Sequence, residues 1–393
     1  MLKVCHIITR MILGGAQENT LLTVRGLHED PGYEVDLVTG PALGPEGELL
    51  EEARSLGIEP IIISSLRREI NPLNELRAFW AIYRLLKKGN YDIVHTHSSK
   101  AGVLGRWAAW LAGVELIVHT IHGLPFHEYQ SKPEYLLYSG LERISARISD
   151  QIQTVCDRMA EKAAAAGVKP KQGFRTVYSG MELEEFLNVP PTGSEEALAV
   201  KKKWGYEARE FVFVKIARLF HLKGHKYCLE AFSQVLKKNP RARLLLVGDG
   251  VLRSELENMC AELSIEDMVK FAGLVPYQKI PEMLAASDCL VHASLREGLA
   301  RVIPQAQASG RPVISFDIDG APEAIDDRQS GILVKPKDTA GLAAAMTRVC
   351  EDNKFREKII KQARSWVKPK FDWRHMVEEI KKCYEELPMP DNF

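Results

Sequence analysis

Short runs of β-branched and aliphatic residues alternate with stretches of helical periodicity along the first half of the chain. The apolar runs that predict strands are 3–9, 34–39, 59–64, 92–95, 116–120, 151–155 and 175–178. Amphipathic stretches that predict helices lie between them, at 16–28, 73–88, 101–111 and 158–166. Strands and helices in strict alternation are typical of a parallel sheet covered on both faces. The first half is therefore predicted to be a doubly wound α/β domain.

The same alternation starts again after a polar segment that contains prolines, at 189–196. The strands predicted beyond it are 211–216, 243–247, 269–272, 289–292, 312–316 and 332–334. Amphipathic helices are predicted near the end of the chain, at 339–350, 353–366 and 373–387. The pattern predicts two Rossmann-like doubly wound domains in tandem, with a cleft between them.

Composition limits the function without naming it. The chain has 393 residues, of which 52 are Lys or Arg and 52 are Asp or Glu, so it has no overall basic field for nucleic acid. Its seven cysteines are scattered and include no Cys-x-x-Cys pair, which favours reduced thiols. No run of 18 apolar residues occurs. We expect a cytoplasmic protein that is at most peripheral to the inner face of a membrane.

A first candidate site follows the strand predicted at 211–216. Arg218 stands at the end of this strand, and Lys223-Gly224 opens the next helix. Two cations beside a helix N-terminus can stabilise a departing nucleoside diphosphate without a metal ion. The alternative is that both side chains are ordinary surface cations.

A second candidate site lies between the strands predicted at 289–292 and 312–316. Gly298 lets backbone N–H groups approach a ligand, and a helix is predicted to begin near Leu299 and to end at Gly310. Glu297, at the mouth of this loop, suits hydrogen bonds from sugar hydroxyls better than contact with phosphate. A plain surface turn is the alternative.

Other glycine loops follow predicted strands but do not complete a dinucleotide fingerprint. Gly14-Gly15 opens the first helix, Gly248 follows the strand at 243–247, and Gly273 follows the strand at 269–272. None has the Gly-x-Gly-x-x-Gly spacing, so we do not expect NAD. Asp317-Ile318-Asp319 spells a metal-binding Asp-x-Asp, but its place after a strand predicts a loop without a metal.

Three histidines stand where strands of the first domain are predicted to end: His95, His97 and His122. Ligands lie at such strand ends in open α/β sheets. Zinc is disfavoured because no Cys or carboxylate partner has a suitable spacing. The loop at 98–100 is a candidate for contact with an acceptor.

Aromatic and basic residues share the helix predicted at 73–88. Phe79, Trp80 and Tyr83 are accompanied by arginines and lysines. Such a helix could lie on a membrane surface. We favour the other interpretation, a buried aromatic face and a solvated basic face.

Taken together, Arg218, Lys223-Gly224 and Glu297-Gly298 resemble the signature of the retaining glycosyltransferases of family 4, of the bacterial surface-polysaccharide type. The resemblance implies a GT-B fold with an acceptor-side domain at 1–190, a donor domain at 191–368 and a helix at 369–393 that returns to the first domain, Pro369 marking the crossing.

The same resemblance implies roles for individual residues. Arg218, Lys223 and the amides of Gly298 and Leu299 would hold the diphosphate, and Glu297 would orient the donor sugar. The family has a second Glu, which touches the ribose, where this chain has Gln305.

The remaining assignments from the resemblance concern the edges of the site. The donor would be lined by glycines of four loops: Gly14 and Gly15, Gly224, Gly248 and Gly273. The backbone of the segment at Gly273 would contact the nucleobase. His122 would lie near the acceptor and the reacting face of the sugar.

The resemblance implies transfer of a sugar from a nucleoside-diphosphate sugar to a hydroxyl of a saccharide or lipid-linked acceptor, with no cofactor and no metal, in surface-polysaccharide or glycolipid synthesis. Two alternatives are a nucleotide-sugar 2-epimerase of the same fold and a nucleotide-sugar-binding protein with weak catalysis, for which Gln305 is the hint.

Overall fold

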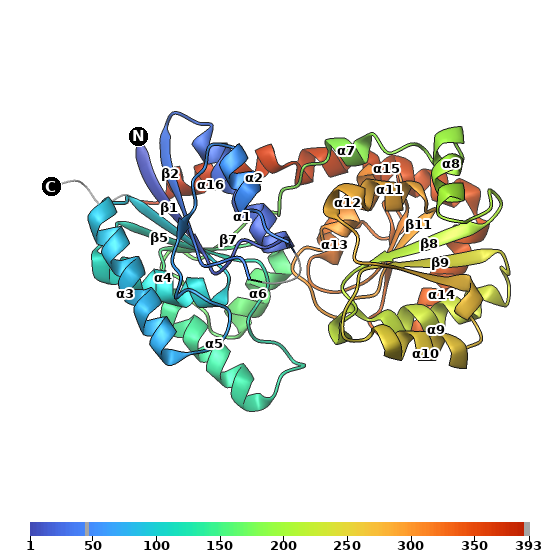
Figure 1. Ribbon diagram of the computed structural model, residues 1–393, viewed down its shortest axis with the longest axis horizontal. Coiled ribbons are helices and arrows are strands. Elements are labelled where there is room, and N and C mark those ends of the chain that lie inside the picture. Colours follow the sequence, from blue (N-terminus) through green and yellow to red (C-terminus); the bar gives the residue numbers. More distant parts are fainter. Residues whose placement is uncertain (44–46, 389–393) are drawn as a thin grey trace. The chain divides into compact units, whose positions relative to one another are not determined.

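The chain forms two compact α/β units. A computed structural model describes residues 1–43 and 47–388. One unit consists of Met1–Met181 with Trp373–Phe393, and the other is Glu182–Asp372. Each unit is built on one parallel sheet with helices on both faces (Figure 1). The prediction of two doubly wound α/β domains is confirmed.

Within the described residues, the sheet of the first unit has seven strands in the order β3-β2-β1-β4-β5-β6-β7, all parallel. The strands are β1 Leu2–Ile8, β2 Tyr33–Thr39, β3 Ile61–Ile62, β4 Ile93–His97, β5 Leu116–Ile121, β6 Gln151–Thr154 and β7 Phe174–Thr176. Only β3 is much shorter than predicted. The strand order reverses between β1 and β4, which is where ligands bind in such sheets.

Local signals in the sequence explain where the helices of this unit begin. The helices are α1 Gly15–His28, α2 Leu50–Ser55, α3 Pro72–Gly89, α4 Ser99–Ala112, α5 Lys132–Ala146, α6 Asp157–Ala165 and α16 Trp373–Glu386. Asn71 caps α3 and is followed by Pro72 at the first helical position. Ser131 and Glu134 form a reciprocal capping box at the start of α5.

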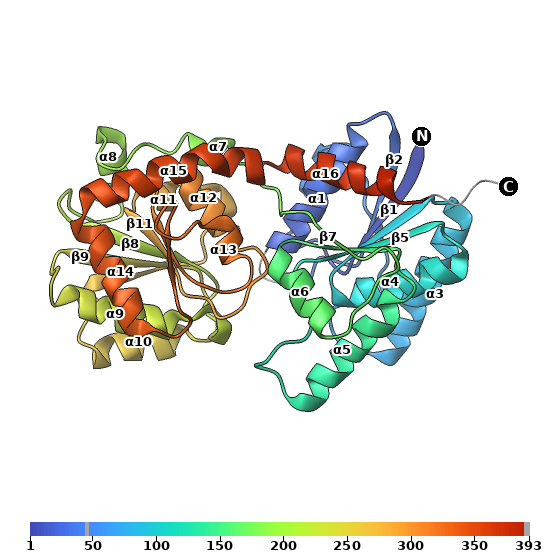
Figure 2. The ribbon, with the colours of Figure 1, turned by 180° about the vertical axis from the view of Figure 1, so that it is seen from behind.

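The C-terminal helix α16 is part of the first unit and packs beside α1 on one face of its sheet (Figure 2). Tyr384 and Val377 are buried there against Val4 and Ile93 of the strands. Gly26 of α1 makes the close approach possible, because a Cβ at this position would lie 2.7 Å from the Val377 side chain. Helices α3 and α4 cover the opposite face.

The second unit has a six-stranded parallel sheet in the order β10-β9-β8-β11-β12-β13. Its strands are β8 Phe211–Ile216, β9 Ala242–Val247, β10 Val269–Gly273, β11 Cys289–His292, β12 Val313–Phe316 and β13 Ile332–Val334. Its helices are α7 Glu184–Leu187, α8 Glu195–Lys203, α9 His225–Leu236, α10 Arg253–Glu262, α11 Ile280–Ala285, α12 Val302–Ala308, α13 Ala321–Ala324, α14 Thr339–Glu351 and α15 Asn353–Phe371, with short 3₁₀ helices η1 His221–Lys223, η2 Glu266–Met268 and η3 Tyr277–Lys279. The strand order reverses between β8 and β11.

Two predicted helix boundaries were wrong. The helix expected to begin near Leu299 begins at Val302, because residues 299–301 form the end of the loop. The helix predicted at 353–366 does not end there, because α15 continues through Pro369 to Phe371. Pro369 lies in the last turn, where few backbone bonds remain to be lost, and the fully buried Phe371 anchors that turn.

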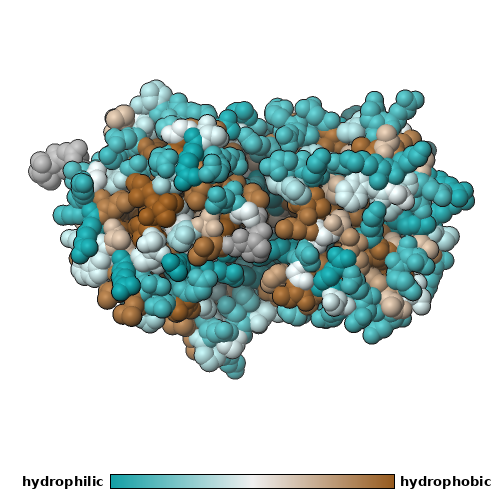
Figure 3. Space-filling model, viewed as in Figure 1, coloured by the Kyte–Doolittle hydropathy of each residue, from teal (hydrophilic) through white to brown (hydrophobic). Residues whose placement is uncertain are grey.

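The face of the molecule seen in Figure 3 is mainly hydrophilic, with apolar residues in scattered patches. On α3, Leu73, Leu76 and Trp80 are 67%, 57% and 42% exposed, whereas Phe79 and Tyr83 pack against the core. The preferred interpretation of this helix therefore holds for two of its three aromatic residues. In the part of the chain that the structure describes, no helix is both long enough and apolar enough to cross a membrane.

Candidate active site

The turn from β8 into α9 is pressed against the end of β11. Gly224 adopts a φ of +64°, and a Cβ there would lie 1.8 Å from the Ala293 carbonyl oxygen. Only glycine fits such a position. Arg218 lies exposed beyond β8, with its guanidinium 5.0 Å from the Phe220 ring centroid, and Lys223 ends η1. The turn thus places Lys223 beside the loop that follows β11.

Lys223 and Glu297, 74 positions apart in the sequence, meet in an ion pair. Lys223 Nζ lies 2.5 Å from Glu297 Oε1, and both side chains are partly buried. His292, at the end of β11, places its Nε2 3.5 Å from the same oxygen. The structure therefore brings together Lys223 and Glu297, two of the residues on which the sequence prediction rests.

The loop after β12 holds the Glu297 loop in place. The backbone N–H of Glu297 donates to Asp319 Oδ2 at 2.7 Å, and the Gly320 N–H donates to the Gly298 carbonyl at 3.1 Å. Asp319 has a φ of 40°, an uncommon conformation that Asp tolerates better than most residues. Asp319, part of the Asp-x-Asp sequence, thus acts here as a support for the loop.

Electrostatics keep Glu297 ionised. Burial disfavours the charged carboxylate, but the charge of Lys223 and the interaction with His292 outweigh burial and hold the Glu297 pKa well below its usual range. Burial lowers the pKa of His292, and its Nδ1 bonds to Ser315 Oγ at 3.0 Å. A neutral imidazole and an ammonium therefore flank one carboxylate.

A buried lysine lies beneath this cluster. Lys215 of β8 is 1% exposed, and among the described residues its Nζ has no hydrogen-bond partner. Burial lowers its pKa to about 8, with smaller effects from Cys228, Lys223 and Glu297. His225, whose Nε2 lies 3.0 Å from the Arg218 carbonyl oxygen, has its pKa lowered to about 3, also mainly by burial.

In the second unit, the other residues that the sequence analysis assigned to donor binding lie as follows. Gln305 lies buried on α12, and its Nε2 donates to the Tyr277 hydroxyl at 3.2 Å. The N–H of Gly248 donates to the Gly273 carbonyl at 2.9 Å, which joins the ends of β9 and β10. A Cβ at Gly248 would lie 2.2 Å from the Ala217 carbonyl oxygen, so this glycine is needed for packing. Leu299 is buried.

In the first unit, His122 borders a hollow of about 270 Å³ that is also lined by Ser98 and Ser99. Gly14 precedes α1 with an extended φ of 171°, which any residue adopts, and Gly15 is the first residue of the helix. The candidate loop at 98–100 is in fact the start of α4. Lys100 is held there by Glu75 at 2.7 Å, so its ammonium is engaged within the fold.

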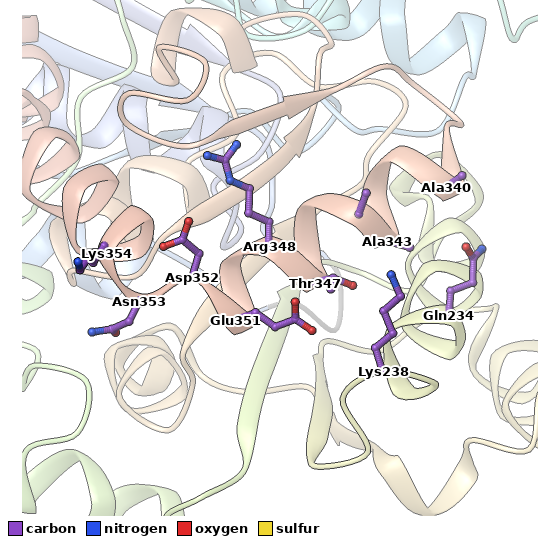
Figure 4. Close-up of a pocket in the computed structure, with 11 residues that line it drawn as sticks. Gln234, Lys238, Ala340, Ala343, Thr347, Arg348, Glu351, Asp352, Asn353 and Lys354 are labelled. Carbon is purple, nitrogen blue, oxygen red and sulfur yellow. The ribbon is translucent and has the colours of Figure 1, made fainter.

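A larger hollow, of about 690 Å³, lies elsewhere on the second unit (Figure 4). It is formed by α9, α14 and the start of α15, with Lys238, Thr347 and Glu351 among its lining residues. None of the described residues that line it comes from a strand end, so we do not assign it to the candidate site.

Sequence reasoning missed His292, Lys215 and the role of Asp319. His292 could have been found as a polar residue at the end of an apolar strand. Lys215 offered a similar signal, because it interrupts the apolar run of β8. The support from Asp319 depends on a contact between two loops, which no local pattern reveals.

Both units match known glycosyltransferase domains. Residues 14–174 match the glycosyl transferase 4-like domain, and residues 198–366 match the glycosyl transferases group 1 family. The UDP-Gal:alpha-D-GlcNAc-diphosphoundecaprenol alpha-1,3-galactosyltransferase of Escherichia coli is 29% identical over 389 residues, which cover 98% of this chain and 97% of that protein. The D-inositol 3-phosphate glycosyltransferase of Corynebacterium kroppenstedtii is 26% identical, with coverage of 90% and 81%.

Solved structures show the same fold. Anabaena HepE in complex with UDP-glucose has a TM-score of 0.82 at 22% identity, covering 98% of this chain and 100% of that one. WaaG, described as a glycosyltransferase involved in lipopolysaccharide biosynthesis, has a TM-score of 0.74 at 16% identity, with coverage of 97% and 99%. With its two family matches, its fold and its paired strand-end residues, this chain belongs to the GT-B glycosyltransferases of the family 4 type.

Proposed function

We propose that the protein is a retaining, metal-independent hexosyltransferase that uses a nucleoside-diphosphate sugar. The observation that carries this proposal is the Lys223–Glu297 pair beyond the carboxyl ends of β8 and β11, with Arg218 in the same segment after β8. This is the point of strand reversal, where open α/β sheets bind ligands. Two cations at one site supply the charge that a metal ion would otherwise supply to a departing diphosphate.

The chemistry divides between the side chains as follows. The bond from the anomeric carbon to the diphosphate breaks, and a bond from the same carbon to the acceptor oxygen forms on the same face of the sugar. The proton of the acceptor hydroxyl passes to the departing phosphate oxygen. Arg218 and Lys223 hold the diphosphate, with the amides of Gly298 and Leu299. The ionised Glu297 accepts hydrogen bonds from the sugar.

We assign the remaining predicted residues to contacts with the donor or the acceptor. Gln305 is placed on the ribose, and the backbone around Gly248 and Gly273 on the nucleobase. In the first unit, Gly14 and Gly15 are placed near the donor, and His122 near the reacting face of the sugar. No cofactor beyond the donor substrate is required.

The relatives suggest which substrates to try first. The Escherichia coli relative is named for UDP-galactose and a diphosphoundecaprenol-linked sugar, and HepE was solved with UDP-glucose. We therefore place a UDP-hexose as donor and a saccharide or lipid-linked sugar as acceptor, in glycolipid or surface-polysaccharide synthesis. Both relatives described above are named as transferases, which favours transfer over 2-epimerisation.

The test is release of nucleoside diphosphate from UDP-, GDP- and ADP-sugars, with and without lipid-linked or saccharide acceptors. We expect slow release from one donor and faster release when an acceptor is present. Lys223→Ala and Arg218→Ala should each lower turnover by about 10²–10³. Lys226→Ala is the matched control, because Lys226 is an exposed lysine only three residues beyond Lys223, in the first turn of α9.

The outcomes separate the alternatives. Near-wild-type turnover in both the Lys223 and Arg218 variants would rule out the assigned site. Conversion of the donor sugar to its 2-epimer without acceptor would identify an epimerase. Tight donor binding with no product under any condition would identify a binding protein.

The exposed stripe of Leu73, Leu76 and Trp80 on α3 supports a peripheral contact with a membrane surface as part of this proposal. Arg77 and Arg84 lie on the same helix, and such a basic, apolar helix suits anionic lipid. Cosedimentation with anionic vesicles should exceed that with zwitterionic vesicles. The Leu76→Ser/Trp80→Ser double variant should lose this difference, whereas Val251→Ser, at a 71% exposed position of the second unit, should keep it.

A further inference from the structure

A row of polar side chains crosses the sheet of the first unit, just below the carboxyl ends of its strands. His6 of β1 is paired in register with His95 of β4, and His97 of β4 is paired with Thr120 of β5. Paired residues of parallel strands lie on the same face, as do residues two apart on one strand. All four side chains therefore lie on the face that α16 covers, within what would otherwise be an apolar core.

These side chains are joined by hydrogen bonds that end at His122. His122 Nε2 lies 3.0 Å from His97 Nδ1, and His97 Nε2 lies 2.9 Å from His6 Nδ1. The Tyr384 hydroxyl of α16 lies 3.5 Å from His6 Nε2 and 2.5 Å from His95 Nδ1. The rings of His95 and His97 are stacked, with centroids 4.5 Å apart.

At the end opposite His122, this row of hydrogen bonds continues to Thr120 of β5 and Gln153 of β6. His95 Nε2 lies 2.7 Å from Thr120 Oγ1, and the Thr120 hydroxyl is 3.4 Å from Gln153 Oε1. Each ring nitrogen of His6, His95 and His97 thus has a partner. His6 and His95 are 0% exposed and His97 is 1% exposed, whereas His122 is only partly buried and borders the hollow beside Ser98 and Ser99.

The three buried imidazoles are neutral at ordinary pH. Burial lowers the pKa of His6 to about 3 and those of His95 and His97 well below the usual value. A neutral imidazole carries one proton, so each ring donates at one nitrogen and accepts at the other. In a row of hydrogen-bonded rings, a nitrogen that donates to one neighbour leaves the other nitrogen to accept from the next. Once the donor and the acceptor are known for one hydrogen bond, the tautomer of every ring in the row follows.

The Thr120–Gln153 contact sets that direction. The Thr120 hydroxyl donates its hydrogen to Gln153 Oε1, so the Thr120 oxygen accepts from His95 Nε2–H. His95 Nδ1 then carries no hydrogen and accepts from the Tyr384 hydroxyl. Tyr384 then accepts from His6 Nε2–H, and His6 Nδ1 accepts from His97 Nε2–H. His97 Nδ1 finally accepts from His122 Nε2–H, which leaves Nδ1 of His122 as the basic nitrogen.

We propose that His6, His97 and Tyr384 are positioning residues that hold His122 in a single tautomer, with its proton on Nε2, for the transfer reaction. This inference rests on the proposed function, in which His122 lies near the reacting face of the sugar. A basic Nδ1 at that place accepts a hydrogen bond from a sugar or acceptor hydroxyl. The C-terminal helix thereby acts on the chemistry through a side chain that touches no substrate.

A metal site is the competing assignment for the same histidines. One nitrogen from each of His6, His95 and His97 can be chosen so that all three lie within 4.8 Å of one another. A metal would require those nitrogens to give up their present partners, Tyr384 among them. We favour the hydrogen-bonded chain because it accounts for both nitrogens of each ring.

The first experiment reads the tautomers directly, by long-range ¹H–¹⁵N correlation spectra of ¹⁵N-histidine-labelled full-length protein. We expect the Nε2–H form of His122 in the wild type, assigned with His122→Gln. Tyr384→Phe removes only the hydroxyl and should give a mixture of both His122 tautomers, as should His6→Gln. Tyr33→Phe is the matched control, because its ring lies 6.5 Å from that of Tyr384 on the same side of the sheet.

The second readout is kinetic. Tyr384→Phe should lower kcat about tenfold and leave the donor KM within about twofold, as expected for a residue that orients a catalytic group. Tyr33→Phe should leave both unchanged. An unchanged His122 tautomer in Tyr384→Phe, or a changed tautomer with wild-type kcat, would overturn the inference.

Two further outcomes separate this inference from its alternatives. Stoichiometric metal in the purified protein that is lost in His6→Gln would overturn it in favour of a metal site. A wild-type protein that turns over no donor would contradict the proposed function, while the spectra of the same samples would still show whether the chain sets the tautomer of His122.

Discussion

At the scale of single residues, the site brings together charges that the fold would not tolerate separately. Glu297 is stabilised as a carboxylate by Lys223, and His292 completes its surroundings without adding a charge. Lys215 lacks such compensation, since no acceptor among the described residues reaches its Nζ. An unpaired buried ammonium opposes folding. The buried Lys215 ammonium therefore lowers the free energy of unfolding of the second unit.

Replacing Lys215 by Met should therefore stabilise the protein. With a pKa lowered to about 8, the folded chain binds this proton less tightly than the unfolded chain, so the cost is complete below pH 8 and is relieved between pH 8 and 10.5. We expect Lys215→Met to raise the free energy of unfolding at pH 7 by roughly 1–3 kcal/mol, measured by urea denaturation. The exposed Lys238→Met is the control, and a less stable Lys215→Met would show that the ammonium has a compensating partner.

Gln305 permits a second test at this scale. The carboxylate of Gln305→Glu would accept a hydrogen bond from Tyr277 and would bind a ribose hydroxyl more strongly than an amide does. We expect several-fold tighter donor binding by calorimetry. Gln307→Glu, on the same helix but with its amide bonded to the Ala324 carbonyl, should not tighten binding. Equal or weaker donor affinity in Gln305→Glu would remove Gln305 from the ribose.

At the scale of elements, the site depends on how closely the turn after β8 packs against the end of β11. Gly224 and Gly273 both have positive φ, of 64° and 72°. They differ in their surroundings: a Cβ at Gly224 would meet the Ala293 carbonyl oxygen at 1.8 Å, whereas a Cβ at Gly273 would meet nothing within 4 Å. Alanine substitutions at these two glycines therefore distinguish two contributions to the loss of stability: backbone strain alone at Gly273, and strain plus a steric clash at Gly224.

We expect Gly273→Ala to lower stability by about 1 kcal/mol, the cost of the left-handed conformation alone. Gly224→Ala should cost more, roughly 3 kcal/mol or above, because the turn must move away from β11. It should also lower turnover, since Lys223 would lose its place beside Glu297. Thermal unfolding and diphosphate release measure the two effects, and equal losses in both variants would contradict the packing argument.

At the scale of the whole molecule, the buried histidines make the first unit sensitive to acid. His6, His95, His97 and His119 all have pKa values lowered by burial, so the unfolded chain binds more protons than the folded chain below pH 6.5. The contribution of these neutral histidines to the free energy of unfolding is therefore complete above pH 6.5 and is lost as the pH is lowered. His6 alone, with a pKa lowered to about 3, should remove roughly 2 kcal/mol by pH 5.

Urea denaturation at pH 7.5, 6 and 5 measures this dependence. We expect a steep loss of stability toward pH 5 that is smaller in His6→Gln, which cannot take up the proton. The exposed His28→Gln should keep the wild-type slope. Stability that is constant from pH 7.5 to 5 would contradict neutral, buried imidazoles.

Much of the fold could be predicted from the sequence because its signals are local. Apolar runs located β11 and β13 to the residue, and helical periodicity located the start of α14 at Thr339. The alternation of strand and helix indicated two parallel sheets. The end of the helix predicted at 353–366 was wrong, since α15 runs on to Phe371 and tolerates Pro369 in its last turn.

The candidate site was predicted only in part. Strand ends, glycines and charges pointed to Lys223, Glu297 and His122, since parallel strands bring their carboxyl ends to one edge of a sheet. The tertiary structure decided the rest: the pairing of Lys223 with Glu297, the support from Asp319 and the hydrogen bonds from Tyr384 to His122. These contacts join residues far apart in the chain, and sequence patterns report only what lies within a few turns of each residue.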